Sequence, residues 1–181
     1  MNRTCVDKDG QPIPWVTYSF IDFFVGKKIS DFSILEFGSG NSTLFWHKCT
    51  NQIFSIEHDR DWFNKVKNLL PSQYKEQLLF LQLGTGTDHD YTKAATHLKR
   101  KFDIIFVDGR ERVKCAIDSR PWLSEKGVLV LDDSERERYA DAVSFYLSQG
   151  FKKLDFWGIA PGIFNNKCTS IFYRPNNILD I

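Results

Sequence analysis

Short apolar runs and amphipathic runs alternate along most of this chain, and this alternation constrains the fold more than any other feature of the sequence. The apolar runs have the length of strands and are hydrophobic on both faces, as strands inside a parallel sheet are; they cover residues 33–37, 52–57, 78–83, 103–107 and 128–132. Segments with a helical period separate and follow them, over residues 42–49, 59–70, 91–100, 111–119 and 134–149. The alternation predicts an α/β fold, a three-layer sandwich in which helices cover both faces of a mostly parallel sheet.

The two ends of the chain break this alternation. Near the C-terminus, strand-like runs over residues 151–157 and 169–174 have no helix between them, and they predict an antiparallel pair at one end of a seven-stranded sheet. Near the N-terminus, Pro14 predicts the start of a helix after a polar arm. We therefore expect an N-terminal arm and helix over residues 1–29 and one α/β domain over residues 30–181.

Two local predictions concern elements near the end of the chain. Ser134 is expected to cap the helix over residues 134–149, and Gly150 is expected to end it. Residues 158–168 are expected to form a loop between the last two strands, where a substrate-binding loop would lie.

Net charge and hydropathy exclude several classes of protein. The chain has 181 residues with 24 Lys and Arg against 23 Asp and Glu, so no overall basic field favours nucleic acid, although RERVK at 110–114 is a candidate local patch. No apolar run approaches the roughly 20 residues that a membrane helix needs. The four cysteines are scattered, which is typical of reduced thiols in a cytosolic protein. We expect a cytoplasmic protein that binds neither nucleic acid nor a membrane.

A carboxylate and two glycines lie where the first strand is expected to end, and ligands of open α/β sheets bind beyond the carboxyl ends of the strands. Gly38 and Gly40 let the backbone turn tightly and approach a ligand, and the following helix presents free N–H groups. A pyrophosphate would suit those groups, but Glu36 adds a negative charge that suits an ammonium better. S-adenosylmethionine (SAM) carries an ammonium, a carboxylate and a sulfonium, and matches this pattern. A tight turn that binds no ligand is the alternative.

The ends of the second and third strands offer further contacts for a nucleoside. Glu57, about twenty residues after Glu36, could accept hydrogen bonds from ribose hydroxyls, either of NAD or of SAM. A solvated helix start is the alternative for Glu57. His58 follows it and is expected to be exposed beside the same site. The loop over residues 84–91 is expected to meet the adenine through Asp88 or a backbone amide.

Three carboxylates lie at the ends of the fourth and fifth strands: Asp108, Asp132 and Asp133. Packed together they would repel one another, and their pKa values would rise unless a positive group lay among them. The candidates are the sulfonium of a ligand, a divalent cation with oxygen ligands, or Arg110 and Arg112. The alternative is that one carboxylate caps the next helix and the others are solvated.

Four segments in combination resemble the class I (Rossmann-like) SAM-dependent methyltransferase superfamily: LEFGSGNST, IFSIEHD, FDIIFVDG and GVLVLDDS. The resemblance covers residues 30–175, and its implied fold is a Rossmann-like sheet that ends in an antiparallel pair. Ser42 stands where the first motif of the family commonly has its last glycine. By this resemblance the glycine loop would hold the methionine end of SAM, and Glu57 the ribose. The residues expected around the cofactor are Glu36, Gly38, Ser39, Gly40, Ser42, Thr43, Glu57, His58, Asp88 and Asp108.

Within the superfamily, the strand-end acids resemble those of magnesium-dependent small-molecule O-methyltransferases. There the metal binds the substrate and lowers the pKa of the hydroxyl that is methylated. The resemblance thus implies a Mg²⁺ site on Asp108, Asp132 and Asp133. The catechol-type enzymes usually have Asp-Asn where this chain has Asp-Asp. Asp108 is the first candidate for the catalytic base or metal ligand, with Asp133 in support.

The leading hypothesis is therefore methyl transfer from SAM to an oxygen or nitrogen of a small-molecule acceptor. An NAD(P)-dependent oxidoreductase is less well matched, since Thr43 stands at the third glycine of the dinucleotide fingerprint and no Tyr-x-x-x-Lys pair occurs. A third reading is a methyltransferase-like subunit without catalytic activity. A homodimer is compatible with each of these readings.

Overall fold

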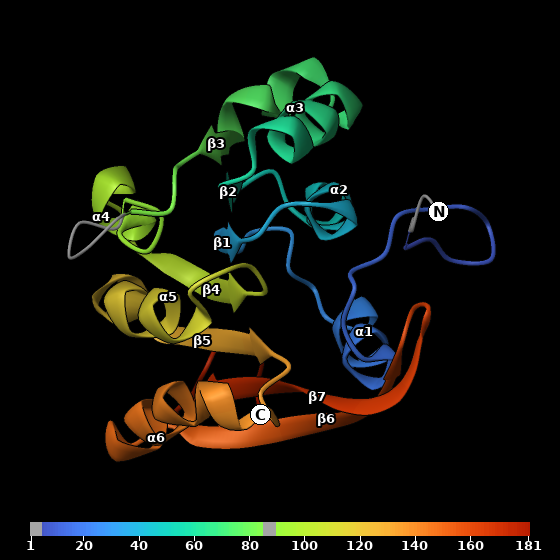
Figure 1. The fold of residues 1–181 in the computed structure, drawn as a ribbon. Helices are drawn as coiled ribbons and strands as arrows, with labels where there is room; N and C mark the ends of the chain where they lie inside the picture. Colours follow the sequence, from blue (N-terminus) through green and yellow to red (C-terminus); the bar gives the residue numbers. More distant parts are fainter. Residues whose placement is uncertain (1–4, 85–89) are drawn as a thin grey trace.

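The computed structural model describes residues 5–84 and 90–181, and its strands form one seven-stranded sheet. The strand order is β3-β2-β1-β4-β5-β7-β6 (Figure 1). The strands are β1 (Ile34–Phe37), β2 (Ile53–Glu57), β3 (Leu78–Phe80), β4 (Phe102–Val107), β5 (Leu123–Asp132), β6 (Lys152–Ala160) and β7 (Ile163–Tyr173). The first five run parallel, and β7 is antiparallel to both β5 and β6. The predicted sheet with its C-terminal antiparallel pair is confirmed.

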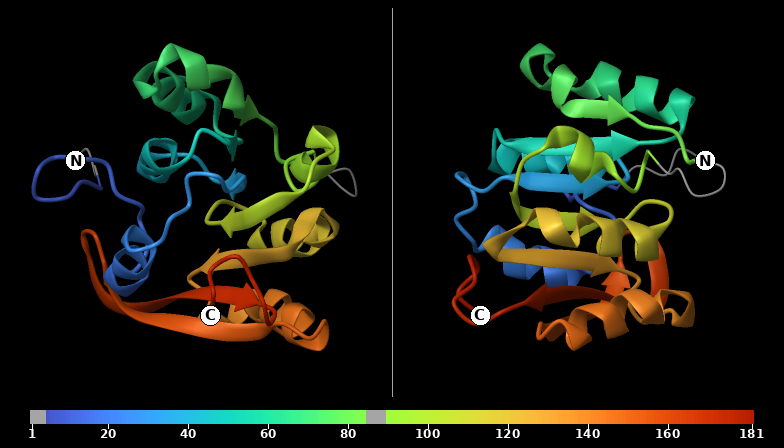
Figure 2. Two further views of the ribbon diagram at one scale, coloured as in Figure 1. Left: turned by 180° about the vertical axis from the view of Figure 1, so that it is seen from behind. Right: turned by 90° about the vertical axis from the view of Figure 1, so that its left-hand side faces the viewer.

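Helices cover both faces of the sheet, because successive side chains of a strand point to opposite faces. In β4, Ile105 and Val107 belong to one buried cluster, and Ile104 and Phe106 to another. The first cluster lies under α4 (Ala94–Leu98), α5 (Arg112–Ser119) and α6 (Ala140–Ser148). The second lies under α1 (Tyr18–Val25) and α2 (Asn41–Cys49), and α3 (Arg60–Leu69) packs on β3 through a smaller cluster. Figures 1 and 2 show this three-layer arrangement.

The N-terminal helix packs into the same core as the sheet. Its Phe20 ring lies 5.6 Å from Phe156 of β6 and 6.0 Å from Phe106 of β4, centroid to centroid. Thr17, which precedes α1, donates its hydroxyl to the Phe156 carbonyl, and its N–H to the Thr169 hydroxyl. The helix therefore begins at Tyr18 rather than near Pro14, because Thr17 is bound to the C-terminal strand pair.

Two local predictions near the end of the chain were wrong. Ser134 does not cap a helix: its hydroxyl lies 2.6 Å from that of Ser170 on β7, and α6 begins only at Ala140, after a short 3-10 helix over Glu137–Tyr139. Residues 158–168 form the turn end of a β-hairpin rather than a loop, since the turn comes between Ala160 and Ile163, which pair with each other. Gly150, with φ +78°, follows α6 as predicted.

Among the described residues, no helix is both long and apolar enough to cross a membrane.

Candidate active site

The cavity that holds most of the predicted site residues lies at the carboxyl ends of the parallel strands. It has a volume of about 560 Å³, within the range of small-molecule sites. The loops that follow β1, β2, β4 and β5 form its walls, together with residues of β7 and of the N-terminal segment. The right-hand view of Figure 2 shows β1 and β2 pointing the same way, so their following loops meet on one edge of the sheet.

The loops after β1 and β4 approach each other backbone to backbone. Gly38 has φ +95°, a conformation that side chains rarely tolerate, and a Cβ there would lie 2.7 Å from the Cα of Gly109. The Gly38 N–H donates to the Ile56 carbonyl at 2.9 Å, and the Asp108 N–H donates to the Phe37 carbonyl at 3.0 Å. The two glycines bring the start of α2 and the end of β4 to the same cavity.

Glu36 does not line the cavity, although it was predicted to contact the cofactor. It is fully buried behind the glycine loop, where one carboxylate oxygen accepts the hydroxyls of Thr43 and Ser55, both at 2.6 Å. Burial raises the Glu36 pKa to about 7, and the hydroxyl hydrogen bonds oppose that rise. Glu36 and Thr43 therefore tie β1 and β2 to the first turn of α2 and hold the loop from behind.

Glu57 lies in the cavity wall and binds the glycine loop. One of its carboxylate oxygens accepts the N–H and the hydroxyl of Ser39, at 3.1 and 2.9 Å, and the other accepts the backbone N–H groups of His58 and Asp59. Sequence reasoning did not single out Trp62 on α3, whose ring N–H donates to the Ser39 carbonyl at 2.8 Å. Trp62 adds an aromatic wall, and its spacing on the helix gave no signal of that role.

The N-terminal segment also reaches this cavity. Cys5 and Trp15 both line it, and the side-chain amide of Asn41, the first residue of α2, donates to the Cys5 carbonyl. From the sequence, Cys5 was expected in a polar arm and Trp15 in the helix that starts at Pro14, and neither was expected to line the site. In the fold they form part of the wall beside the glycine loop.

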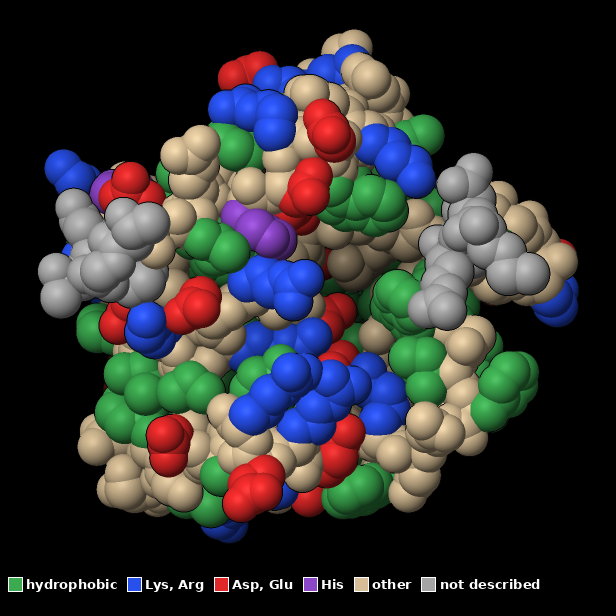
Figure 3. Space-filling model, viewed as in Figure 1, with side chains coloured by type: hydrophobic (Ala, Val, Ile, Leu, Met, Phe, Trp, Pro, Cys, Tyr) green, Lys and Arg blue, Asp and Glu red, His purple; other side chains and the backbone are tan. Residues whose placement is uncertain are grey.

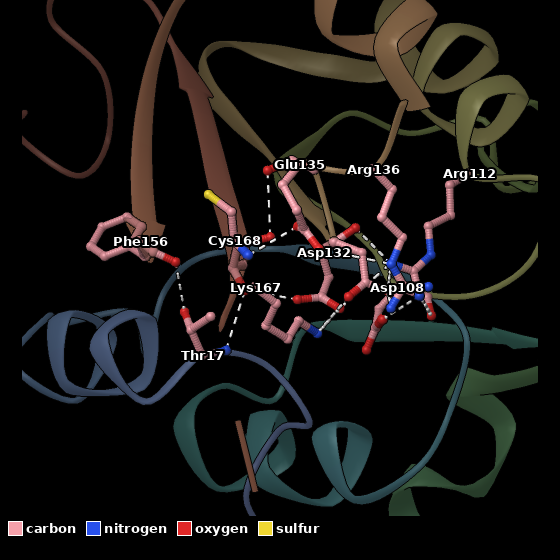
Figure 4. Close-up of polar contacts among 12 residues, drawn as sticks. Thr17, Asp108, Arg112, Asp132, Glu135, Arg136, Phe156, Lys167 and Cys168 are labelled. Atoms are coloured by element: carbon pink, nitrogen blue, oxygen red, sulfur yellow. Dashed lines mark hydrogen bonds and ion pairs between the residues drawn. The ribbon is translucent and has the colours of Figure 1, made fainter. Parts of the chain in front are cut away.

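The three strand-end carboxylates meet as predicted, and Arg112 of α5 is bound among them. Its guanidinium lies 2.9 Å from Asp108, 3.5 Å from Asp132 and 3.2 Å from Asp133, nitrogen to oxygen (Figure 4). Arg136 approaches Asp133 at 3.0 Å. The sequence suggested a ligand sulfonium, a divalent cation or an arginine as the positive group among these acids. In the structure this group is the Arg112 guanidinium.

Lys167 supplies a further cation that sequence reasoning missed. Its ammonium lies 2.6 Å from Asp132 and 2.9 Å from Asp133, and only 7% of its side chain is exposed (Figure 4). The Thr169 hydroxyl also donates to Asp132, at 2.7 Å. Lys167 was missed because it lies in the segment predicted as a loop. Its place beside Asp132 results from the pairing of β7 with β5, in which Asp132 opposes Thr169.

The structure does not support the magnesium site predicted on these acids. Lys167 and the two arginines already occupy the carboxylate oxygens that a divalent ion would need. Within residues 5–84 and 90–181, no group of three or more His, Cys, Asp and Glu side chains is arranged to hold a metal. The residues present therefore do not fit Mg²⁺.

The surroundings shift the pKa values of Asp108 and Asp133 in opposite directions. Burial and the charge of Asp132 raise the pKa of Asp108 well above its ordinary value, although Arg112 and Lys167 oppose the rise. Burial would also raise the pKa of Asp133, but Lys167, Arg112 and Arg136 outweigh it and the pKa is lowered. Asp108 therefore takes up a proton more readily than Asp133 does.

The structure brings together most of the predicted site residues. Those that line the cavity are Gly38, Ser39, Gly40, Ser42, Glu57, His58, Asp108, Asp132 and Asp133. Glu36 and Thr43 lie behind the loop. Asp88 lies outside the described residues, so the adenine contact stays a prediction.

Comparison with known proteins places the fold. No protein-family model and no curated protein matches the chain. Among solved structures, a methyltransferase-like protein from Silicibacter pomeroyi is similar, with 20% identity, a TM-score of 0.60 and coverage of 93% of this chain and 91% of that one. An O-methyltransferase from Bacillus cereus in complex with SAH has 12% identity, a TM-score of 0.57 and coverage of 86% and 78%. An rRNA methylase from Streptococcus thermophilus has 14% identity, a TM-score of 0.56 and coverage of 83% and 90%.

These likenesses extend over most of each chain, and together with the strand order they show the fold of class I, Rossmann-like SAM-dependent methyltransferases. The resemblance seen in the sequence is thereby confirmed at the level of the fold. Identities this low carry no information on the acceptor, and the neighbours differ in it, since one is named an O-methyltransferase and another an rRNA methylase.

Proposed function

We propose that the protein transfers a methyl group from SAM to an oxygen or nitrogen of a small-molecule acceptor. The observation that carries this proposal is that the glycine loop, Glu57 and Asp108 line one cavity at the carboxyl ends of the strands. The methyltransferase fold supports it as well. A cytoplasmic location, a homodimer, and no binding of nucleic acid or membrane stay predictions from the sequence.

The residues of the cavity fit the charge pattern of SAM. The first N–H groups of α2, which follow the glycine loop, offer donors for the methionine carboxylate, whereas the N–H groups of Gly38, Ser39 and Gly40 already donate within the fold. Glu57 lies where ribose hydroxyls could donate to a carboxylate, and Trp62 forms an apolar wall. When bound, SAM would supply an electrophilic methyl group on a positively charged sulfur.

Asp108 is the proposed catalytic base. It lines the cavity beside Gly109, and its raised pKa favours the uptake of a proton from an acceptor O–H or N–H as the methyl group is transferred. The Arg112 guanidinium fixes the carboxylate at 2.9 Å. The protein's other task is to hold the acceptor in line with the methyl group, which needs no covalent step on the chain.

The test begins with isothermal titration of the purified protein with S-adenosylhomocysteine (SAH), with NADH as the comparison ligand. We expect SAH to bind with micromolar affinity and NADH not to bind. An oxidoreductase would show the reverse preference. Binding of neither ligand would overturn the proposed function and would favour a subunit without catalytic activity.

Asp108→Asn tests the assigned base. Turnover on a panel of hydroxyl and amine acceptors should fall by about 100-fold or more, the range of general-base effects, whereas SAH affinity should stay within a few-fold. Asp141→Asn, an exposed carboxylate of α6, is the matched control and should change neither quantity. Unchanged turnover of the Asp108 variant would contradict the assignment.

A further inference from the structure

A second cavity, of about 590 Å³, adjoins the first and is lined mainly by charged side chains. The two cavities share Asp108, Arg110, Arg112 and Arg136 in their walls, and Arg138 lines the second. Figure 3, which views the carboxyl ends of the parallel strands, shows Lys and Arg side chains gathered at the centre of this face. The second cavity therefore adjoins Asp108, the proposed base that would take the proton of the acceptor.

The acidic side chains that line this second cavity are already neutralised by neighbouring cations. Asp108 pairs with Arg112 at 2.9 Å, and Glu111 pairs with Lys114 at 3.2 Å. Among the described residues of the cavity wall, these pairs leave no free carboxylate to balance additional positive charge.

Two arginines of the wall have no such partner. Arg110 and Arg138 are exposed, and within the part of the chain that the structure describes neither has a carboxylate at ion-pair distance. Arg138 lies 4.8 Å from the centre of the Tyr139 ring, and Arg112 lies 5.2 Å from it, so the ring lies beside both guanidinium groups. Unpaired guanidinium groups at one cavity repel each other, and an anionic ligand would relieve that repulsion.

The arrangement follows from a repeated tripeptide. Arg-Glu-Arg occurs at 110–112, just beyond β4, and again at 136–138, just beyond the adjacent β5. In each run one arginine, Arg112 or Arg136, binds the strand-end acids, and the other lines the cavity without an ion-pair partner in the described part of the chain. Neighbouring parallel strands end on the same edge of the sheet, so the two runs bring their unpaired arginines to one cavity.

We infer that the acceptor is an anion: a small molecule with a phosphate or carboxylate group that binds Arg110 and Arg138, and with its reacting oxygen or nitrogen at Asp108. This inference rests on the proposed function and names its substrate class. Guanidinium forks bind both kinds of group in bidentate fashion, which fixes orientation as well as charge. Binding by the acidic group would position the reacting atom beside the cofactor cavity, because both cavities share the Asp108 wall.

The first test measures anion binding by titration calorimetry at constant ionic strength, with inorganic phosphate and malonate as the probes and chloride as the background. We expect at least one probe to bind the SAH-saturated protein saturably. The double variant Arg110→Gln, Arg138→Gln should weaken that binding by about tenfold or more. Arg138→Gln alone, at a residue that lines only the second cavity, should also weaken it and should leave SAH affinity unchanged. Lys126→Gln removes one exposed charge outside both cavities and should alter neither affinity.

The second test measures turnover on acceptors in matched pairs, each acid against its neutral ester or amide, with sugar phosphates against the free sugars. We expect methylation of the acids only, and a rise in KM for the double variant. The probe that binds more tightly, phosphate or malonate, identifies the acidic group.

The results separate the inference from the function on which it rests. If SAH binds but neither probe does, or if the double variant binds them as well as the natural chain, the inference is overturned and the methyltransferase proposal stands. Methylation of the neutral partners at equal rates would overturn it too. If SAH fails to bind, the proposed function falls, and probe binding by the free protein then decides whether the anion site exists at all.

Discussion

At the scale of single residues, Glu36 shows how burial changes the meaning of a charged position. The sequence presents it as a carboxylate at the mouth of a ligand loop, and the fold buries it completely behind that loop. Its hydrogen bonds to Thr43 and Ser55 fix the start of α2, and burial raises its pKa from 4.5 to about 7. The residue therefore acts on the site through the position of the loop.

The raised pKa predicts a pH dependence of stability. The folded state holds the Glu36 proton more tightly than the unfolded state, so this contribution is complete below pH 4.5 and is lost as the pH rises through about 7. Relative to Glu36→Gln, which keeps an acceptor for both hydroxyls, the natural chain should lose about 3 kcal/mol of unfolding free energy over that range. Urea denaturation at a series of pH values measures the difference. The exposed control Glu125→Gln should follow the natural chain, and parallel curves for Glu36→Gln would refute the prediction.

At the scale of elements, the site depends on β7 as much as on the parallel strands. Asp133 turns the chain at the end of β5 with φ +56°, a conformation that Asp tolerates better than most residues. β7 then brings Lys167 against both Asp132 and Asp133, where burial would lower the lysine pKa but the two carboxylates outweigh it and raise the pKa. A side chain of the hairpin thus supplies the charge that a metal ion would otherwise have to supply.

Removal of the Lys167 charge should destabilise the fold. Lys167→Gln leaves buried carboxylates short of a cation, and loss of one partner of a buried pair costs about 3–5 kcal/mol. Lys153→Gln on β6 is the matched control: its pair with Asp155, at 3.1 Å, is partly exposed and should contribute about 1 kcal/mol or less. Urea denaturation of both variants measures the two losses of unfolding free energy.

Thermal unfolding should show no stabilisation of the natural chain by millimolar Mg²⁺, because Lys167 and the arginines already pair with the acids. Stabilisation by Mg²⁺ would restore the metal site predicted from the sequence.

At the scale of the whole molecule, the N-terminal helix is part of the central core. Phe20, Ile21 and Phe24 of α1 belong to the buried cluster that also contains Phe106 and Trp46. The residues before α1 reach the candidate active site at Cys5 and Trp15. We therefore expect α1 to unfold together with the sheet in a single transition.

Two substitutions on α1 test this cooperativity. Phe20→Ala should lower the unfolding free energy by about 3–5 kcal/mol, because the ring is fully buried among three elements. Tyr18→Ala, on the same helix but with the residue 42% exposed, should change it by about 1 kcal/mol or less. Denaturant unfolding followed by fluorescence and by circular dichroism gives both values. A separate early transition in Phe20→Ala would show that α1 is an independent unit.

The sequence by itself determined the strand and helix pattern and the loops at the strand ends. Hydrophobic periodicity is a local property of the sequence. It therefore predicted the correct last residue for four of the parallel strands: Phe37, Glu57, Val107 and Asp132. The glycines of the first loop and the three acids were likewise read from short segments, and the acids do meet.

Only the tertiary structure decided what surrounds those residues. Lys167 reaches the acids through antiparallel pairing across the sheet, and Trp62 reaches the glycine loop from α3; neither contact has a local sequence signal. Burial placed Glu36 behind the loop, and Arg110 and Arg138 line the second cavity with no carboxylate at ion-pair distance among the described residues. The charge balance and the burial of a side chain depend on residues that are distant in the sequence and close in the fold. A pattern of adjacent residues carries no information about those neighbours.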